Sequence, residues 1–384
     1  MNKEERNLVI AGTVPVEDLP LTVGEARLDG SYLDIDGYRI PCAQGTGAMV
    51  SAALVTLSYL KVGKPWVVTA GDIGKGGGSR QILEYLSERL PDLSPKVLAL
   101  HYCLPDLALM KRLQEAVDKC PNPPKLVADA SSMYGAKAAG LAEKFDLFTP
   151  DATEIAFLAD PEASHPSYIN KHLFNADASQ ATSLIAQAYK VKGASKALLV
   201  KGSVDYIVNE GEILETVSEP DIPAMEAIGG TGDSITGLVS AFIYAGLELH
   251  EAAIIAAKAN RMAGEFAQAS GATPVSQIIE QLPAVFGQYL CYWSGVCTVD
   301  PTELSYHEGN TMIEIDVRGL SCPIPVVKTK KAIEGNPGET ISVLVETAVS
   351  KENVSRLANS RGYSITVETL EGEEYRLELD PPRA

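Results

Sequence analysis

The sequence predicts an α/β protein in which helices cover both faces of a parallel β-sheet, followed along the chain by a smaller two-layer α+β domain. Up to about residue 290, short apolar segments alternate with helical segments, which is the order of a parallel sheet with crossover helices. The remaining chain changes to the order β-α-β-α-β-β, which fits a separate domain of about 70 residues. With 384 residues the chain can bury two hydrophobic cores.

In the first part, five apolar segments are the strand candidates: Pro65–Thr69, Lys96–Leu100, Lys125–Ala128, Leu147–Thr149 and Lys196–Val200. Helical patterns lie between and after them, in Ala48–Tyr59, Gln81–Leu90, Leu107–Lys119, Ala178–Val191, Asp233–Tyr244 and His250–Ala269. In the last part, the six predicted elements are Met312–Arg318, Pro325–Ile333, Ile341–Glu346, Ser350–Arg361, Tyr363–Thr369 and Glu374–Leu379. We therefore predict a large domain over 1–290, a linker over 291–311 without helical or strand periodicity, and a small domain over 312–384.

Composition excludes several classes of protein. The chain is 46% hydrophobic and carries a net charge of −18, which disfavours duplex nucleic acid and anionic membranes as partners. The sequence contains no apolar run of about 18 residues, so no membrane span is predicted. The first apolar run is too short for the hydrophobic core of a signal peptide. The six cysteines are scattered and the five histidines follow no ligand spacing, so we predict a cytoplasmic protein without a structural metal.

A glycine-rich stretch, Gly229-Gly230-Thr231-Gly232-Asp233, directly precedes an apolar helix. Glycines allow a tight turn, and the unpaired N–H groups of a following helix create a site for phosphate anions. A carboxylate there can accept the proton of a hydroxyl that is being phosphorylated. The alternative is an ordinary turn in which Asp233 caps the helix.

Four further segments, together with this stretch, resemble motifs of the ribokinase superfamily in the family's order. They are Gly45–Ala48, Val127–Ala130, Thr149–Glu154 and Leu199–Gly202, and Ser276–Pro283 resembles the family's closing helix. The resemblance is closest to the YjeF C-terminal branch, the ADP/ATP-dependent NAD(P)H-hydrate dehydratases, and it covers about residues 40 to 290. One departure is Asp151-Ala152-Thr153-Glu154, which stands where that branch has His-Pro-Gly-Glu and is nearer to ribokinases proper.

The resemblance implies an enzyme that uses ATP or ADP with Mg²⁺ and a small-molecule acceptor, with Asp233 as catalytic base. By the same resemblance, nucleotide phosphates are bound by Gly229, Gly230, Thr231, Gly232 and Lys201. Substrate or magnesium is expected close to Gly47, Asp129 and Glu154.

Two other features of the large domain leave alternatives open. The cluster Gly71–Gly78 lacks the Gly-Lys-Ser/Thr of a Walker A motif, and it is either a mobile loop that closes on ligand or a flexible connector. The segment Ala159–Phe174 contains His165 and His172 among prolines, where surface positions are favoured over metal ligands.

In the small domain, Cys322 is followed by Pro323 and Pro325 at the predicted start of a helix. A helix N-terminus lowers the pKa of a thiol, and the nearby lysines favour an anionic sulfur species, although a lone cysteine is often buried and inert. Residues 316–333 resemble the signature of the TusA/SirA-type sulfur carriers, and the segment Lys351–Arg356 is similar to their YedF-like branch. The resemblance implies a persulfide on Cys322 and a cysteine desulfurase or sulfur-acceptor protein as partner.

Two overall functions follow. The first is a nucleotide-dependent kinase or hydrate dehydratase fused to a sulfur carrier. The second is a sulfur-relay carrier whose kinase-like domain only binds nucleotide or a partner. A homo-oligomer is expected in either case.

Overall fold

The structure is a computed structural model, and it describes residues 8–163, 180–290, 293, 312–320, 323–370, 372 and 374–382. The chain divides into two compact units, one built mainly from residues before Pro283 and one from Pro283 onward. The predicted linker, His165, His172 and Cys322 lie outside the described residues, apart from Trp293. The domain boundaries therefore stay a prediction.

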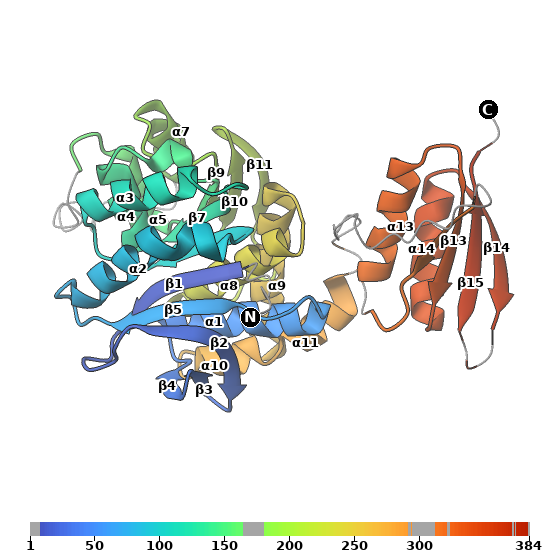
Figure 1. Cartoon of the computed structure of the whole chain (residues 1–384), viewed down its shortest axis with the longest axis horizontal. Coiled ribbons are helices and arrows are strands. Elements are labelled where there is room, and N and C mark those ends of the chain that lie inside the picture. The colour runs from blue at the N-terminus through green and yellow to red at the C-terminus, as the bar shows by residue number, and fades with distance from the viewer. Residues whose placement is uncertain are drawn as a thin grey trace. The chain divides into compact units, whose positions relative to one another are not determined.

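The large unit contains an 11-stranded sheet with parallel strands in its centre and antiparallel strands at both edges (Figure 1). From edge to edge the strands are β11 (Glu212–Val217), β10 (Asp205–Asn209), β9 (Ala197–Val200), β8 (Leu147–Phe148), β7 (Lys125–Asp129), β6 (Val97–His101), β1 (Leu8–Val14), β5 (Trp66–Gly71), β2 (Thr22–Asp29), β3 (Tyr32–Ile35) and β4 (Tyr38–Pro41). The five predicted strands are β5 to β9, so the predicted α/β class with a parallel sheet is confirmed.

Helices cover both faces of this sheet. One face shares a hydrophobic core with α2 (Gly77–Leu93), α3 (Leu107–Asp118), α4 (Ser131–Ala138), α5 (Ala152–Ala159) and α7 (Ala181–Lys190). Helix α8 (Thr231–Tyr244) contacts β1, β6 and β7, and α9 (Leu249–Phe266) contacts β9, β10 and β11. The described residues also form the α-helices α1 (Gly45–Leu60), α10 (Val275–Ile279) and α11 (Leu282–Val285). No helix among the described residues is long and apolar enough to cross a membrane.

The sequence did not predict several strands, and the structure shows why. Strand β1 directly follows a charged N-terminal segment, and all seven of its residues are buried in the sheet centre. Strand β11 lies at the edge of the sheet, and β2 lies between β5 and β3 in its antiparallel part; both contain exposed residues, so neither sequence reads as a buried apolar run.

The glycine cluster Gly71–Gly78 forms a turn around one carboxylate. Asp72 accepts hydrogen bonds from the backbone N–H groups of Gly74, Lys75, Gly76 and Ser79, and from the Ser79 hydroxyl. These hydrogen bonds hold the pKa of Asp72 below its usual value, although burial opposes the shift. The carboxylate accepts the backbone N–H groups at and before the start of α2, which lack partners within the helix. An anionic group of the protein therefore already occupies this turn.

The small unit has the predicted β-α-β-α-β-β order. Its elements are β12 (Met312–Asp316), α13 (Ile324–Gly335), β13 (Thr340–Val345), α14 (Ala348–Ser360), β14 (Ser364–Thr369) and β15 (Tyr375–Asp380). The sheet order is β12-β13-β15-β14, with β12 parallel to β13 and the other pairs antiparallel. A core of residues from the strands and both helices, including Val343, Val354 and Leu377, is separate from that of the large unit.

Candidate active site

Two neighbouring parallel strands place functional side chains at the same edge of the large sheet. His101 ends β6 and Asp129 ends β7, and the two residues are register partners. The carboxyl ends of parallel strands are where open α/β sheets bind ligands. Both side chains are buried, with exposed fractions of 0% and 2%.

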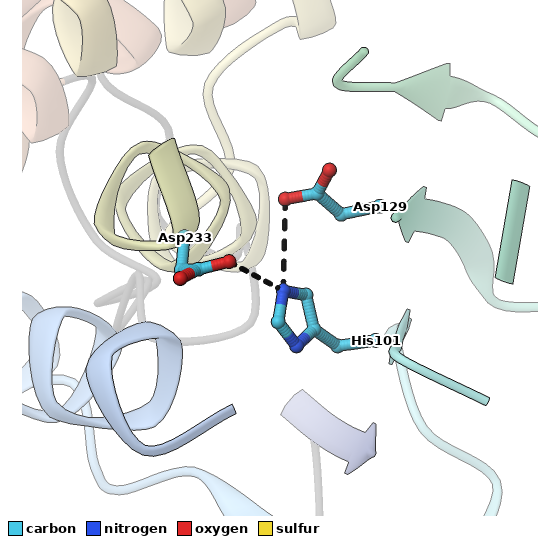
Figure 2. Close-up of side chains that lie close together, drawn as sticks. All are labelled: His101, Asp129 and Asp233. Atoms are coloured by element: carbon cyan, nitrogen blue, oxygen red, sulfur yellow. Dashed lines mark hydrogen bonds and ion pairs between the residues drawn. The ribbon is translucent and has the colours of Figure 1, made fainter. Parts of the chain in front are cut away.

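Asp233 reaches this strand edge from the first turn of α8. Its Oδ1 lies 3.0 Å from His101 Nε2, and its Oδ2 accepts the backbone N–H of Gly45 at 2.7 Å. Figure 2 shows His101 between the two carboxylates of Asp129 and Asp233, with the same ring nitrogen facing both. The distance from that nitrogen to Asp129 Oδ2 is 3.7 Å.

Lys201 directly follows β9, and its side chain points to Asp129. The ammonium Nζ lies 2.9 Å from each Asp129 carboxylate oxygen. The hydroxyl of Thr236, one turn after Asp233 on α8, donates to Asp129 Oδ2 at 2.5 Å. The predicted residues Asp129, Lys201 and Asp233 therefore share one site, although 104 residues separate the first from the last in sequence.

The charges of this site shift two pKa values. Burial alone would raise the pKa of Asp233, but the His101 hydrogen bond, the charges of His101 and Lys201, and the Gly45 N–H hold it below its usual value. Burial alone would lower the pKa of Lys201, but the carboxylates of Asp129 and Glu154 raise it. Asp233 is therefore ionised and Lys201 is charged at neutral pH.

The glycines before Asp233 are needed for close packing. Gly230 has a φ of 100°, and an added Cβ would meet Val275 Cγ1 at 2.8 Å. A Cβ on Gly229 would meet Gln44 Oε1 at 2.9 Å, whereas Gly232 has room beside the Lys201 side chain. The turn thus brings the start of α8 against the segment that precedes α1.

Gly47 has a packing role in the structure, and its expected proximity to substrate or magnesium stays a prediction. A Cβ there would lie 2.2 Å from the carbonyl oxygen of Pro41, so this glycine lets α1 pack against the end of β4. Gly47 is absent from the residues that line the cavity described below. Its neighbour Gly45 instead contacts Asp233.

Asp151 and Glu154 form a capping box at the start of α5. Asp151 Oδ1 accepts the N–H groups of Thr153 and Glu154, and Glu154 Oε2 accepts the Asp151 N–H. Burial and the nearby carboxylates of Asp151 and Asp129 raise the pKa of Glu154. The local sequence that departs from the resemblance therefore has a complete structural role.

Two residues with left-handed backbone follow the strand ends. Tyr102, after His101, has a φ of 52°, and Ala130, after Asp129, has a φ of 51° with a ψ of −139°. Such conformations are unfavourable for residues with a Cβ and concentrate at functional sites. Both residues line the same cavity.

A cavity of about 500 Å³ opens beside Asp233. The start of α8, Lys201, Asp129 and the capping box line it, together with Asn260 and Arg261 of α9. Its lining contains seven carboxylates but two cations, Lys201 and Arg261. Both cations are paired, since Arg261 Nε donates to Asp205 at 2.8 Å.

A nucleotide with magnesium fits these donors. The N–H groups of Thr231, Gly232 and Asp233 lie in the first turn of α8, where a helix has no internal acceptors for them. The excess of carboxylates suits a ligand that arrives with a divalent cation, and Asp151 and Glu154 are among the carboxylates that line the cavity.

His101, Asp129 and Asp233 also have the spacing of a metal site, because three ligand atoms lie within 4.8 Å of one another. Each of these groups already has a protein partner, however. Lys201 contacts both Asp129 oxygens, and the other ring nitrogen of His101 lies 3.0 Å from Thr46 Oγ1. Lys201 therefore already supplies a positive charge to the Asp129 carboxylate.

Sequence reasoning missed His101, Thr46 and Thr236. His101 ends an apolar strand at the position equivalent to Asp129 in the next strand, which was the signal available. In the small unit, Pro323 directly precedes α13 and Pro325 is buried in its first turn. The position of Cys322 lies outside the described residues.

Comparison with known proteins identifies both parts. Residues 90–284 match the NAD(P)H-hydrate dehydratase family. An uncharacterised protein of Methanocaldococcus jannaschii, MJ1337, is 40% identical over 235 residues, which cover 61% of this chain and 96% of that protein. The chain belongs to the NAD(P)H-hydrate dehydratase family. Within this family, the bifunctional NAD(P)H-hydrate repair enzyme Nnr of Pyrobaculum aerophilum is 31% identical over 194 residues, and the match covers 48% of this chain and 35% of that enzyme.

The tail of this family member matches a second family. Residues 313–380 match sulfurtransferase TusA, so the predicted sulfur-carrier domain is confirmed. A putative sulfur carrier of M. jannaschii, MJ0990, is 37% identical over 67 residues, covering 17% of this chain and 89% of that protein. Among solved structures, the ADP/ATP-dependent NAD(P)H-hydrate dehydratase of Bacillus subtilis with ATP/Mg²⁺ is 16% identical, covers 74% of this chain and 92% of its own, and has a TM-score of 0.39.

Proposed function

We propose that the large domain transfers a phosphoryl group from ATP or ADP to the hydroxyl of a small-molecule acceptor, as a kinase or a hydrate dehydratase. The observation that carries this proposal is the ionised carboxylate of Asp233 at the N-terminus of α8, on the wall of the cavity. A base and an anion-binding helix end are then within one turn of each other. A bound nucleotide with magnesium would supply the phosphoryl group.

The residues of this chain have separate roles in the proposal. The N–H groups of Thr231 and Gly232 bind phosphate oxygens, and Asp233 accepts the proton of the acceptor hydroxyl. Lys201 keeps Asp129 in place through contacts to both carboxylate oxygens. Glu154 faces the same cavity and is the candidate for contact with magnesium or its water.

For the small domain, we propose that Cys322 carries a persulfide. The sequence match to sulfurtransferase TusA supports this role, and Pro323 and Pro325 begin the helix that follows the cysteine. A cysteine desulfurase or a sulfur-acceptor protein is the proposed partner. The acceptor of the large domain and the cargo of the small one need not be the same molecule.

The alternative is a sulfur-relay carrier whose large domain binds nucleotide without turning it over. One observation favours it: both Asp233 oxygens already have a partner, which weakens the carboxylate as a base. The two functions differ in whether nucleotide is consumed.

The test measures ATP and ADP turnover with hydrated NADH as the first acceptor. Asp233→Asn should abolish turnover and leave nucleotide binding by isothermal calorimetry largely unchanged, because backbone groups hold the phosphates. Asp118→Asn, which removes a carboxylate from the exposed end of α3, is the matched control and should retain turnover. Near-normal turnover in Asp233→Asn would show that this residue only caps the helix. Nucleotide binding without turnover in the native chain would favour the alternative, a sulfur-relay carrier.

A further inference from the structure

We propose that His101 is a positioning residue for Asp233: its ring carries protons on both nitrogens and fixes the carboxylate through Nε2–H. The inference rests on the proposed function for its catalytic consequence, but the protonation state itself can be measured without turnover. The proposal gives this buried histidine a role in orienting the base, although no sequence motif marks the residue.

The first step is the proton on Nδ1. Thr46 Oγ1 lies 2.6 Å from the backbone carbonyl of Thr13, which can only accept a hydrogen bond, so the Thr46 hydroxyl donates there. The same hydroxyl oxygen lies 3.0 Å from His101 Nδ1. Because the hydroxyl has one proton, Nδ1–H must be the donor in this second contact.

The second step is the proton on Nε2. This nitrogen lies 3.0 Å from Asp233 Oδ1 and 3.7 Å from Asp129 Oδ2. Without a proton between them, the lone pair of a fully buried imidazole nitrogen would face two carboxylates, which is costly. One proton is therefore shared by Nε2 and Asp233.

The surrounding groups place that proton on the ring. Asp233 also accepts the Gly45 N–H, and Lys201 adds positive charge, so its carboxylate is held ionised. The groups that face His101 are Asp129, Asp233, the Thr46 hydroxyl and the edge-packed ring of Tyr102. The two carboxylates, Asp129 and Asp233, are then balanced by two cations, the Lys201 ammonium and the imidazolium of the histidine.

The consequence is a carboxylate with one orientation. His101 holds Oδ1 and the Gly45 N–H holds Oδ2, while each oxygen keeps a second lone pair for an acceptor hydroxyl. In the proposed step, the acceptor O–H bond breaks and its proton forms an O–H bond to Asp233. The acceptor oxygen bonds to phosphorus while the bond from phosphorus to the bridging oxygen of the nucleotide breaks, and the shortened nucleotide leaves with that electron pair. His101 keeps both of its protons throughout.

The first experiment is NMR of the full chain labelled with ¹⁵N-histidine, without nucleotide. Long-range ¹H–¹⁵N spectra distinguish a doubly protonated ring from each neutral tautomer, and His101→Gln identifies the resonance among the five histidines. We expect the doubly protonated signature at pH 8, and its loss in Asp233→Asn. A neutral ring at pH 8 in the native chain would overturn the proposal whatever the enzyme does.

A divalent cation between the same three groups is the competing explanation. The proposal expects that Zn²⁺, added to chain first treated with a chelator, leaves the Nε2–H resonance in place. If Zn²⁺ removes that proton at one equivalent, the site is a metal site and the positioning role is wrong.

The second experiment is kinetic and depends on turnover by the native chain. His101→Gln retains an N–H donor toward Asp233, whereas His101→Leu has none. We expect His101→Leu to lower kcat by roughly 10²-fold with little change in nucleotide KM, and His101→Gln to recover part of the loss. An equal loss in both variants, or a change confined to KM, would contradict positioning.

Discussion

The ammonium of Lys201 and the carboxylate of Asp129 form an ion pair in which both side chains are buried, with exposed fractions of 10% and 2%. Lys201 follows β9 and Asp129 ends β7, so the pair reaches across the end of β8, which lies between these strands. Nζ is 2.9 Å from each oxygen, and Thr236 and the Ala130 N–H also donate to the carboxylate. The pair therefore joins the ends of β7 and β9, and Thr236 connects it to α8.

We expect Lys201→Met to destabilise the large domain strongly, because Asp129 would remain buried without its cation. Breaking a buried pair in this way costs about 3–5 kcal/mol in the free energy of unfolding. The double variant Lys201→Met/Asp129→Asn should recover part of that loss in a denaturant titration that follows the large domain. Additive losses in the double variant would show that the two side chains are not coupled.

Gly237→Ala should disturb the packing of α8 on α1. An added Cβ would lie 2.1 Å from the carbonyl oxygen of Met49, so one helix has to move. We expect a loss of about 1–3 kcal/mol in the free energy of unfolding. Gly77→Ala, at the start of α2, is the matched control, because nothing lies within 4 Å of its Cβ position. An equally stable Gly237→Ala chain would contradict this packing.

Glu154→Gln should stabilise the protein at neutral pH. The pKa of Glu154 is raised in the folded state by burial and by Asp151 and Asp129, so its ionisation weakens folding as pH rises above the ordinary value of 4.5. Glutamine removes the charge but can still accept the Asp151 N–H. The difference in unfolding free energy from the native chain should vanish below pH 4.5.

Asp72→Asn should show the opposite sign in the same pH series. The hydrogen bonds from the glycine-rich turn lower the pKa of Asp72, so its ionised form stabilises the folded state above the ordinary value of 3.8. The native chain should therefore exceed Asp72→Asn in stability at neutral pH and lose this advantage in acid. If the two variants change stability in the same direction, the assigned causes of their pKa shifts are wrong.

Cys322 should be the cysteine that accepts sulfur. Cys42, Cys103 and Cys120 are buried, and burial raises the pKa of each thiol, that of Cys103 to about 12. After incubation with a cysteine desulfurase and cysteine, peptide mass spectrometry should find added sulfur at Cys322, and none there in Cys322→Ser. Sulfur mainly on Cys291 or Cys297 would contradict the proposed carrier role.

The boundary between the domains should be the preferred site of limited proteolysis. We expect the first cuts within 291–310, and each fragment should survive, because the described parts on either side have separate hydrophobic cores. N-terminal sequencing of the fragments locates the cuts. A first cut after Met312 would place the boundary elsewhere.

The central strands could be predicted because buried parallel strands have apolar sequences, whereas Asp129 and Lys201 could be expected only from the resemblance of Val127–Ala130 and Leu199–Gly202 to family motifs. The antiparallel strands β2 and β11 could not be predicted, because several of their positions are exposed and their sequences contain no continuous apolar run. The contact of Gly45 with Asp233 joins residues 188 apart, and His101 becomes informative only through the partners that folding brings to its two nitrogens. The two proposed phosphate-site glycines 229 and 230 have packing roles that a motif alone does not reveal.

Two helices, α1 and α8, begin beside the same carboxylate, since Asp233 lies in the first turn of α8 and accepts the first N–H of α1. The positive ends of both helix dipoles therefore favour the ionised form of this residue. Because its pKa is lowered, Asp233 in its protonated form is a stronger acid than an ordinary carboxylic acid, and it releases the proton readily. The arrangement that weakens Asp233 as a base thus also regenerates it, so recovery of the base between turnovers should not limit the rate.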